Sequence, residues 1–152
     1  MHGLRHITPN FAIAPQLVAG DFEKLRGLGF AGVIDNRPDD EEGVALPSSL
    51  AADHARKAEL AFHYVPAVGH DLFGKDLVDQ MDDALRAATG PVLAYCKSGT
   101  RSAILWALAE ARHRPVSQIL ADLARADYEL EMLRSELEAE AARFSASAPA
   151  AA

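Results

Sequence analysis

The residues with the clearest chemistry in this chain form one short segment, residues 96–102, which reads Cys-Lys-Ser-Gly-Thr-Arg-Ser. Cys96 is the only cysteine among the 152 residues. The segment follows an apolar run at residues 91–95 that is typical of a buried strand. Apolar residues recur at helical spacing over residues 101–113, so a helix should follow it. Backbone N–H groups at such a strand-to-helix turn lack helical partners, and we therefore predict an anion-binding loop.

The same loop favours the thiolate form of Cys96. A cysteine with the ordinary pKa of about 8.5 is mostly protonated at neutral pH, whereas a thiol at a helix N-terminus beside a cation is mostly ionised. Gly99 permits a sharp turn, Arg101 offers a planar fork of donors, and Ser102 is expected to donate a hydrogen bond to the sulfur. We predict Cys96 and Arg101 to be catalytic. The anion-binding loop comprises Lys97, Ser98, Gly99, Thr100, Arg101 and Ser102.

Composition limits the alternatives. The chain is 49% hydrophobic and 24% charged with a net charge of -7, which fits one soluble globular domain. The sequence has no stripe of Lys and Arg that would indicate nucleic-acid binding. It also has no apolar run long enough for a membrane span or a signal peptide. A lone cysteine excludes an internal disulfide, and His54, His63 and His70 do not have metal-ligand spacing. We expect a cytoplasmic protein without metal or cofactor.

Strand-like and helix-like segments alternate along the chain, which predicts an α/β fold with a mainly parallel sheet. Residues 1–144 are expected to form one domain, and the Ala/Ser/Pro-rich residues 145–152 a disordered tail. A polar loop at residues 36–42 should lie at the carboxyl edge of the sheet, where such folds bind ligands. The expected strands are 16–19, 30–35, 62–65 and 91–95. The expected helices are 21–28, 48–60, 75–88, 101–113, 116–126 and 128–144.

Several separated motifs give the chain a family resemblance. Ile-Asp-Asn-Arg-Pro-Asp at 34–39, Tyr-Val-Pro at 64–66 and the Gly-Pro run with the Cys96 loop at 90–102 agree in order and spacing. Over about residues 5–130 the chain resembles the phosphatase-like domain of beta-lactamase-hydrolase-like proteins. The resemblance implies a dual-specificity type of cysteine phosphatase fold, with a central sheet of four or five strands flanked by helices. Family members stand alone or are fused to persulfide dioxygenases or sulfide-oxidising flavoproteins, which implies partners in sulfur metabolism.

The resemblance also implies that the Asn-Arg-Pro loop lies near Cys96. Asn36 and Arg37 are then candidate accessory residues that orient the catalytic loop or an acceptor thiol. The alternative for Arg37 is a purely structural ion pair with Asp35 or Glu41.

Two details of the Cys96 loop favour sulfur transfer over phosphate hydrolysis. Protein tyrosine phosphatases have five residues between cysteine and arginine, whereas this chain has four, as in rhodaneses. Tyr95 stands where phosphatases usually have His. We therefore predict a sulfurtransferase. Cys96 would accept sulfur from thiosulfate or a small persulfide, form a persulfide, and pass the sulfur to a thiol acceptor such as glutathione.

Two other functions stay open. The first is a phosphatase that hydrolyses a phosphate ester through a cysteinyl-phosphate, with Asp71 as general acid and His70 beside it. Asp71 has an equally simple alternative as a turn-forming residue of an exposed loop. The second is a non-catalytic module that binds anions. The oligomeric state is not predicted.

Overall fold

The computed structural model describes residues 1–147, and within them the sheet has five strands in the order β1-β2-β5-β3-β4. β1 pairs antiparallel with β2, and all other pairings are parallel. The predicted α/β fold with a mainly parallel sheet is therefore confirmed. The strands are β1 (Arg5–Thr8), β2 (Phe11–Ala14), β3 (Gly32–Asp35), β4 (Ala61–Tyr64) and β5 (Val92–Tyr95).

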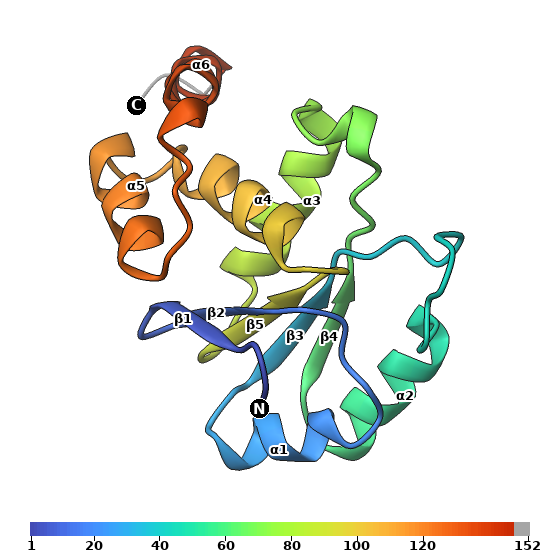
Figure 1. The fold of residues 1–152 in the computed structure, drawn as a ribbon. Helices are drawn as coiled ribbons and strands as arrows, with labels where there is room; N and C mark the ends of the chain where they lie inside the picture. Colours follow the sequence, from blue (N-terminus) through green and yellow to red (C-terminus); the bar gives the residue numbers. More distant parts are fainter. Residues whose placement is uncertain (148–152) are drawn as a thin grey trace.

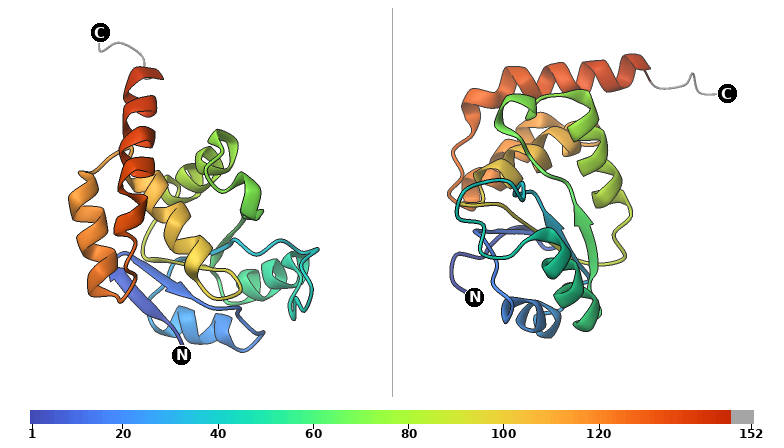
Figure 2. Two further views of the ribbon diagram at one scale, coloured as in Figure 1. Left: turned by 45° about the horizontal axis from the view of Figure 1, so that its top comes forward. Right: turned by 90° about the vertical axis from the view of Figure 1, so that its right-hand side faces the viewer.

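Helices cover both faces of the sheet (Figure 1). α1 and α2 lie on one face and α3 and α4 on the other, while α5 and α6 pack outside α4 (Figures 1 and 2). Strand residues alternate between the layers: in β5, Leu93 and Tyr95 join the core under α1 and α2, and Val92 and Ala94 join the core under α3 and α4. The helices are α1 (Asp21–Gly27), α2 (Ser48–Lys57), α3 (Lys75–Arg86), α4 (Thr100–Glu110), α5 (Val116–Arg125) and α6 (Arg134–Ser147).

The predicted first strand at residues 16–19 is wrong, because the sheet edge is instead the hairpin of β1 and β2. All four residues of β2 are buried, so the strand lacks the alternation that marks a half-buried strand. Pro15 has no N–H to donate to a ladder, and β2 ends directly before it. Beyond Pro15 the backbone N–H of Gln16 donates to the carbonyl of Lys97 at 3.3 Å.

The acidic C-terminal helix packs on this domain. The guanidinium of Arg112, which is 5% exposed, donates to the carboxylate of Glu140 at 2.8 Å, and Leu137 is fully buried. α6 continues to Ser147, three residues into the segment predicted to be a tail, and residues 148–152 lie outside those described. Within the described part of the chain, no helix combines the length and apolar character that crossing a membrane requires.

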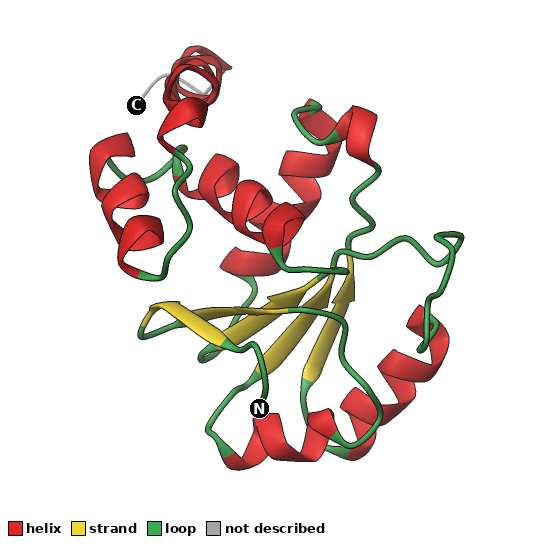
Figure 3. Ribbon diagram, viewed as in Figure 1, coloured by secondary structure: helices red, strands yellow, loops and turns green. Residues whose placement is uncertain are grey.

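The carboxyl ends of the parallel strands meet at one edge of the sheet (Figure 3). Tyr95 of β5 lies beside Ala14 of β2 and Asp35 of β3 in the strand register. The Asn36 backbone N–H donates to the Tyr95 carbonyl at 2.8 Å, which continues the ladder past the end of β3. The chain segments that leave these three strands therefore start side by side.

Candidate active site

Cys96 follows β5 directly and is fully buried. Its sulfur accepts a hydrogen bond from the backbone N–H of Gly99 at 3.1 Å. Gly99 has a φ of 98°, and a Cβ at this position would lie 2.9 Å from Cγ2 of Ile13 and 3.0 Å from the hydroxyl of Tyr128. Only glycine fits both the space and the backbone angle. The loop therefore curls back onto the sulfur and leads straight into α4, whose N-terminus favours negative charge.

The Arg101 guanidinium is held along one edge. Its Nη1 donates to the Ala67 carbonyl at 3.0 Å and to Oε2 of Glu41, and its Nη2 donates to Oε1 of Glu41 at 3.0 Å. Of the five N–H groups of an arginine, these contacts leave Nε–H and one Nη2–H, which form the side fork of the group. The Glu41 carboxylate raises the pKa of Arg101, and the nearby sulfur of Cys96 raises it further. Among residues 1–147 no oxygen acceptor binds this fork, which lies beside the Cys96 sulfur.

Glu41 bridges two arginines. Its Oε1 also accepts from Nε of Arg37 at 3.1 Å, and the Arg101 guanidinium, together with Arg37, holds the pKa of Glu41 below its ordinary value. Arg37 is 4% exposed and donates further to Oε1 of Gln16 and to the Glu42 carbonyl, both at 3.0 Å. These contacts match the structural alternative for Arg37, because they tie the 36–42 loop together and join it to Gln16.

Asn36 connects the Cys96 loop to the residue that follows β4. The Ser102 hydroxyl donates to Oδ1 of Asn36 at 2.8 Å, and Nδ2 of Asn36 donates to the Val65 carbonyl at 2.9 Å. The predicted hydrogen bond from Ser102 to the Cys96 sulfur is therefore wrong, since a hydroxyl has a single proton to donate and Asn36 accepts it. The Asn36 side chain therefore joins the start of α4 to the residue that follows β4.

The remaining loop side chains lie at the surface. Lys97, Ser98 and Thr100 are exposed, and the hydroxyls of Ser98 and Thr100 are 3.4 Å apart. The hydrogen bond to the sulfur comes from the backbone of Gly99 and not from these side chains.

Among residues 1–147, neither Asp71 nor His70 has a hydrogen bond or ion pair to Cys96 or Arg101. They form part of a short 3-10 turn, Gly69–Asp71, where their side chains are 65% and 80% exposed and lie 3.4 Å apart. Asp71 borders a cleft of about 350 Å³ together with Lys75 and Asp76 of α3. Ala67, which precedes this turn, accepts a hydrogen bond from Arg101 through its carbonyl. Within residues 1–147, no group of three or more His, Cys, Asp or Glu side chains is arranged to hold a metal ion.

Sequence reasoning missed three residues near the loop. Glu41 was considered only as a partner of Arg37. Tyr128 places its hydroxyl against Gly99, and its ring lies under the guanidinium of Arg5 at 5.3 Å; burial raises the pKa of Tyr128. Asp35 is 1% exposed, and burial raises its pKa to about 6, although its Oδ1 accepts the Arg37 backbone N–H at 2.9 Å. Glu41 is recognisable in the sequence as an acidic residue, but its pairing with Arg101 could not be predicted because the two residues are 60 positions apart in the chain.

Solved structures share this architecture. A Neisseria meningitidis protein described as a putative phosphatase matches with a TM-score of 0.74 and 31% identity, covering 90% of this chain and 96% of that one. Human DUSP28 matches with a TM-score of 0.61 over 95% of this chain and 97% of its own, at 20% identity, which shows a common fold.

The chain is also similar in sequence to curated proteins. The beta-lactamase hydrolase-like proteins of Xylella fastidiosa (strain Temecula1) and Agrobacterium fabrum are 34% and 32% identical over 104 and 105 residues. These matches cover 68% and 69% of this chain but 24% of each relative, so the chain spans about a quarter of their length. The family model for the phosphatase-like domain of the beta-lactamase hydrolase-like protein matches residues 3–113. The chain belongs to this phosphatase-like family.

Proposed function

We propose that this domain is a cysteine-dependent phosphatase, with Cys96 as nucleophile and Arg101 as the residue that binds the phosphoryl oxygens. The observation that carries the proposal is the side fork of Arg101, which binds no oxygen acceptor among residues 1–147 and lies beside a sulfur that already accepts a backbone hydrogen bond. The phosphatase-like family and the similarity to the Neisseria protein support this reaction over the sulfur transfer that the sequence alone favoured.

The first chemical step forms a sulfur–phosphorus bond. The Cys96 thiolate attacks the phosphorus of a phosphate monoester, and the bond from phosphorus to the leaving oxygen breaks with its electron pair on that oxygen. Arg101 and loop N–H groups bind the non-bridging oxygens, on which negative charge is concentrated. Water then attacks the cysteinyl-phosphate, which releases inorganic phosphate and restores the thiolate.

Asp71 is the proposed donor of the proton that the leaving oxygen needs. Its exposed position requires residues 66–74 to move toward Cys96 when substrate binds. A strongly basic leaving group needs this proton, whereas p-nitrophenolate is stable as an anion. Asp71→Asn should therefore slow phenyl phosphate hydrolysis by about tenfold or more and leave p-nitrophenyl phosphate hydrolysis within about threefold.

Sulfur transfer is the second candidate, favoured by the four-residue spacing between Cys96 and Arg101 and by the exposure of Asp71. Cys96 would attack the outer sulfur of thiosulfate; a new sulfur–sulfur bond forms, the old one breaks, and sulfite leaves without needing a proton. A small thiol would then attack the outer sulfur of the Cys96 persulfide and restore the thiolate. If the domain transfers sulfur, we propose that its functional partner is a persulfide dioxygenase or a sulfide-oxidising flavoprotein.

A paired assay separates the candidates. Purified protein and its Cys96→Ser variant are given p-nitrophenyl phosphate in one arm and thiosulfate with glutathione in the other. The proposal expects phosphate release that requires Cys96 and exceeds sulfite release. Cys96-dependent sulfite release without phosphate release would establish the second candidate instead. Sulfate binding without turnover in either arm would show a non-catalytic anion-binding module.

A further inference from the structure

A second cleft lies at the opposite edge of the sheet from Cys96. Its volume is about 930 Å³, and it is lined by the first residues of β2 and β5, Phe11 and Val92. α4 joins the two places: Arg101 is in its first turn, whereas Trp106 and Glu110 lie farther along and border the cleft. The volume falls within the range of about 300–1,000 Å³ that small-molecule sites occupy.

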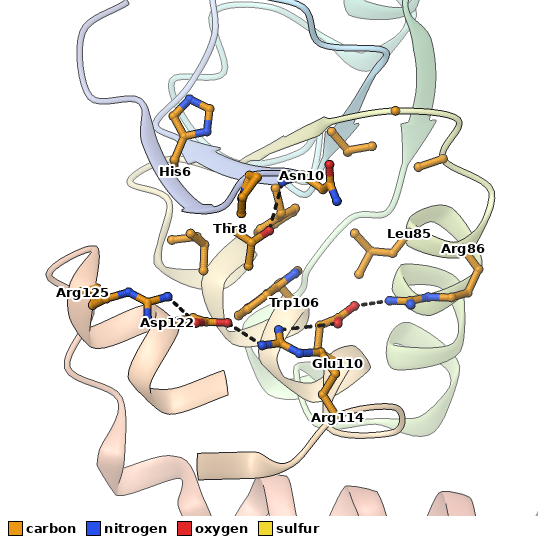
Figure 4. Close-up of a pocket in the computed structure, with 16 residues that line it drawn as sticks. His6, Thr8, Asn10, Leu85, Arg86, Trp106, Glu110, Arg114, Asp122 and Arg125 are labelled. Carbon is orange, nitrogen blue, oxygen red and sulfur yellow. Dashed lines mark hydrogen bonds and ion pairs between the residues drawn. The ribbon is translucent and has the colours of Figure 1, made fainter. Parts of the chain in front are cut away.

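The floor of the cleft is apolar and has a free donor. Trp106 is 2% exposed, stacks on Phe11 with ring centroids 5.2 Å apart, and packs near Leu85 and Val92. Its indole N–H has no acceptor among residues 1–147, and the nitrogen is not enclosed by protein. Figure 4 shows this nitrogen directed toward the side of the cleft where Leu85 and Asn10 lie. The side-chain amide of Asn10 also lacks a partner within the described residues.

One wall of the cleft is a row of alternating charges (Figure 4). Glu110 lies between Arg86 and Arg114, and Asp122 lies between Arg114 and Arg125. The two carboxylate side chains are 11% and 12% exposed, whereas those of Arg86 and Arg125 are 45% and 67% exposed. Arg86 is paired with a second carboxylate as well, because its Nε lies 3.2 Å from Oδ1 of Asp82. The carboxylates of Glu110 and Asp122 are therefore covered by their partners, and the remaining guanidinium donors of Arg86 and Arg125 are accessible at the two ends of the row.

These features select a ligand class. An apolar floor takes an apolar or aromatic body, while the indole N–H, the Asn10 amide and the outer guanidinium donors take an oxyanion. Arg114 lies over the face of Trp106 at 5.9 Å and Phe11 stacks on the ring, so a ligand approaches the indole edge rather than its faces. We propose that this cleft binds a small organic anion, a carboxylate or phosphoryl group carried on an apolar or aromatic body.

Trp106 provides a direct reporter because it is the only tryptophan in the chain. The wild-type protein, labelled with ¹⁵N, is titrated with phenylacetate and with phenylphosphonate, and the single indole N–H signal is followed by NMR. The two acids distinguish a carboxylate from a phosphoryl head, and phenylacetamide is the uncharged control. We expect saturable shifts with at least one acid, a Kd on the order of 1 mM for a ligand of about ten heavy atoms, and binding at least fivefold weaker for the amide.

Matched variants test the location of the site. Arg125→Gln should weaken binding of the acid about threefold, because the substitution removes one exposed cation and leaves Asp122 paired with Arg114. Arg56→Gln is the control, since Arg56 makes the same i,i+3 pair, with Asp53, at 72% exposure on α2. Asn10→Ala should also weaken binding, whereas Cys96→Ser should not.

The proposal is overturned if neither acid shifts the indole signal in a saturable way, or if phenylacetamide binds as tightly as phenylacetate. It is also overturned if Arg56→Gln weakens binding as much as Arg125→Gln. Loss of the shift in Cys96→Ser would assign the effect to the active site instead. Because the NMR titration does not depend on turnover, it tests ligand binding in the cleft independently of the proposed phosphatase activity.

Discussion

Glu41→Gln tests whether the bridging carboxylate positions Arg101 for catalysis. In the structure both Glu41 oxygens accept from the Arg101 guanidinium, and Oε1 also accepts from Arg37. An amide has one acceptor oxygen and an NH₂ group that repels a guanidinium, so the variant loses one of the two bonds to Arg101 and all of the charge attraction. The side fork of Arg101 then no longer points consistently at Cys96.

The magnitude follows from the exposure of the pair. A charge-assisted hydrogen bond contributes about 1.5–3 kcal/mol when buried, but the side chains of Arg101 and Glu41 are 22% and 29% exposed, so we expect about 1 kcal/mol of lost stability. A misdirected fork weakens transition-state binding, and a tenfold fall in kcat corresponds to about 1.4 kcal/mol. We expect kcat to fall about tenfold with a smaller change in KM.

The assay is steady-state hydrolysis of p-nitrophenyl phosphate by wild type, Glu41→Gln, Arg101→Lys and the double variant. Glu42→Gln is the matched control, because Glu42 contributes its backbone carbonyl to Arg37, and its activity should stay within about twofold. A positioning role predicts little further loss when Glu41→Gln is added to Arg101→Lys. Activity at or above wild type in Glu41→Gln would refute the reasoning, because it would mean that the carboxylate competes with substrate for Arg101.

Two further predictions concern the loop and the buried carboxyl group behind it. Gly99→Ala should lower stability by about 1–3 kcal/mol and abolish most activity, because its Cβ would meet Ile13 and Tyr128 at a φ of 98°. Chemical denaturation measures this, with Gly27→Ala as control, since nothing lies within 4 Å of a Cβ there; equal stability of the two variants would contradict the strain. The pKa of Asp35 is raised to about 6 from 3.8, so the folded state binds more protons than the unfolded state between these values, and stability falls as pH rises through about 6. Asp35→Asn should therefore be more stable than wild type at pH 8, by at most about 3 kcal/mol, with little difference near pH 4; an unchanged pH profile in thermal unfolding would contradict the raised pKa.

Local patterns made much of the fold predictable. The strand that ends at Tyr95 and the helix that begins at Thr100 are each set by apolar spacing within a few residues, so the Cys96 loop could be placed between them. Family resemblance predicted that the segment with Asn36 and Arg37 lies near this loop, and the hydrogen bond from Ser102 to Asn36 shows this proximity for Asn36.

Long-range pairing was not predictable in the same way. Glu41 and Arg101 are 60 residues apart, and no local pattern says which of several acidic residues in the 36–42 loop turns toward the arginine. The β1–β2 hairpin was missed because β2 is buried on both faces and short. Ser102 was expected to reach the sulfur because it belongs to the same short segment as Cys96, whereas its hydroxyl donates to Asn36. Tyr128 reaches Gly99 from a segment that was predicted to be helical.

The central claim is that Cys96 forms a covalent bond to phosphorus during turnover. The most direct measurement is acid quenching during p-nitrophenyl phosphate hydrolysis, followed by mass spectrometry of the peptide that contains Cys96. We predict a mass increase of about 80 Da on Cys96, as expected for a cysteinyl-phosphate, which is absent in Cys96→Ser. Hydrolysis that continues in Cys96→Ser, or an adduct of about 32 Da with thiosulfate and none with the phosphate ester, would contradict the claim.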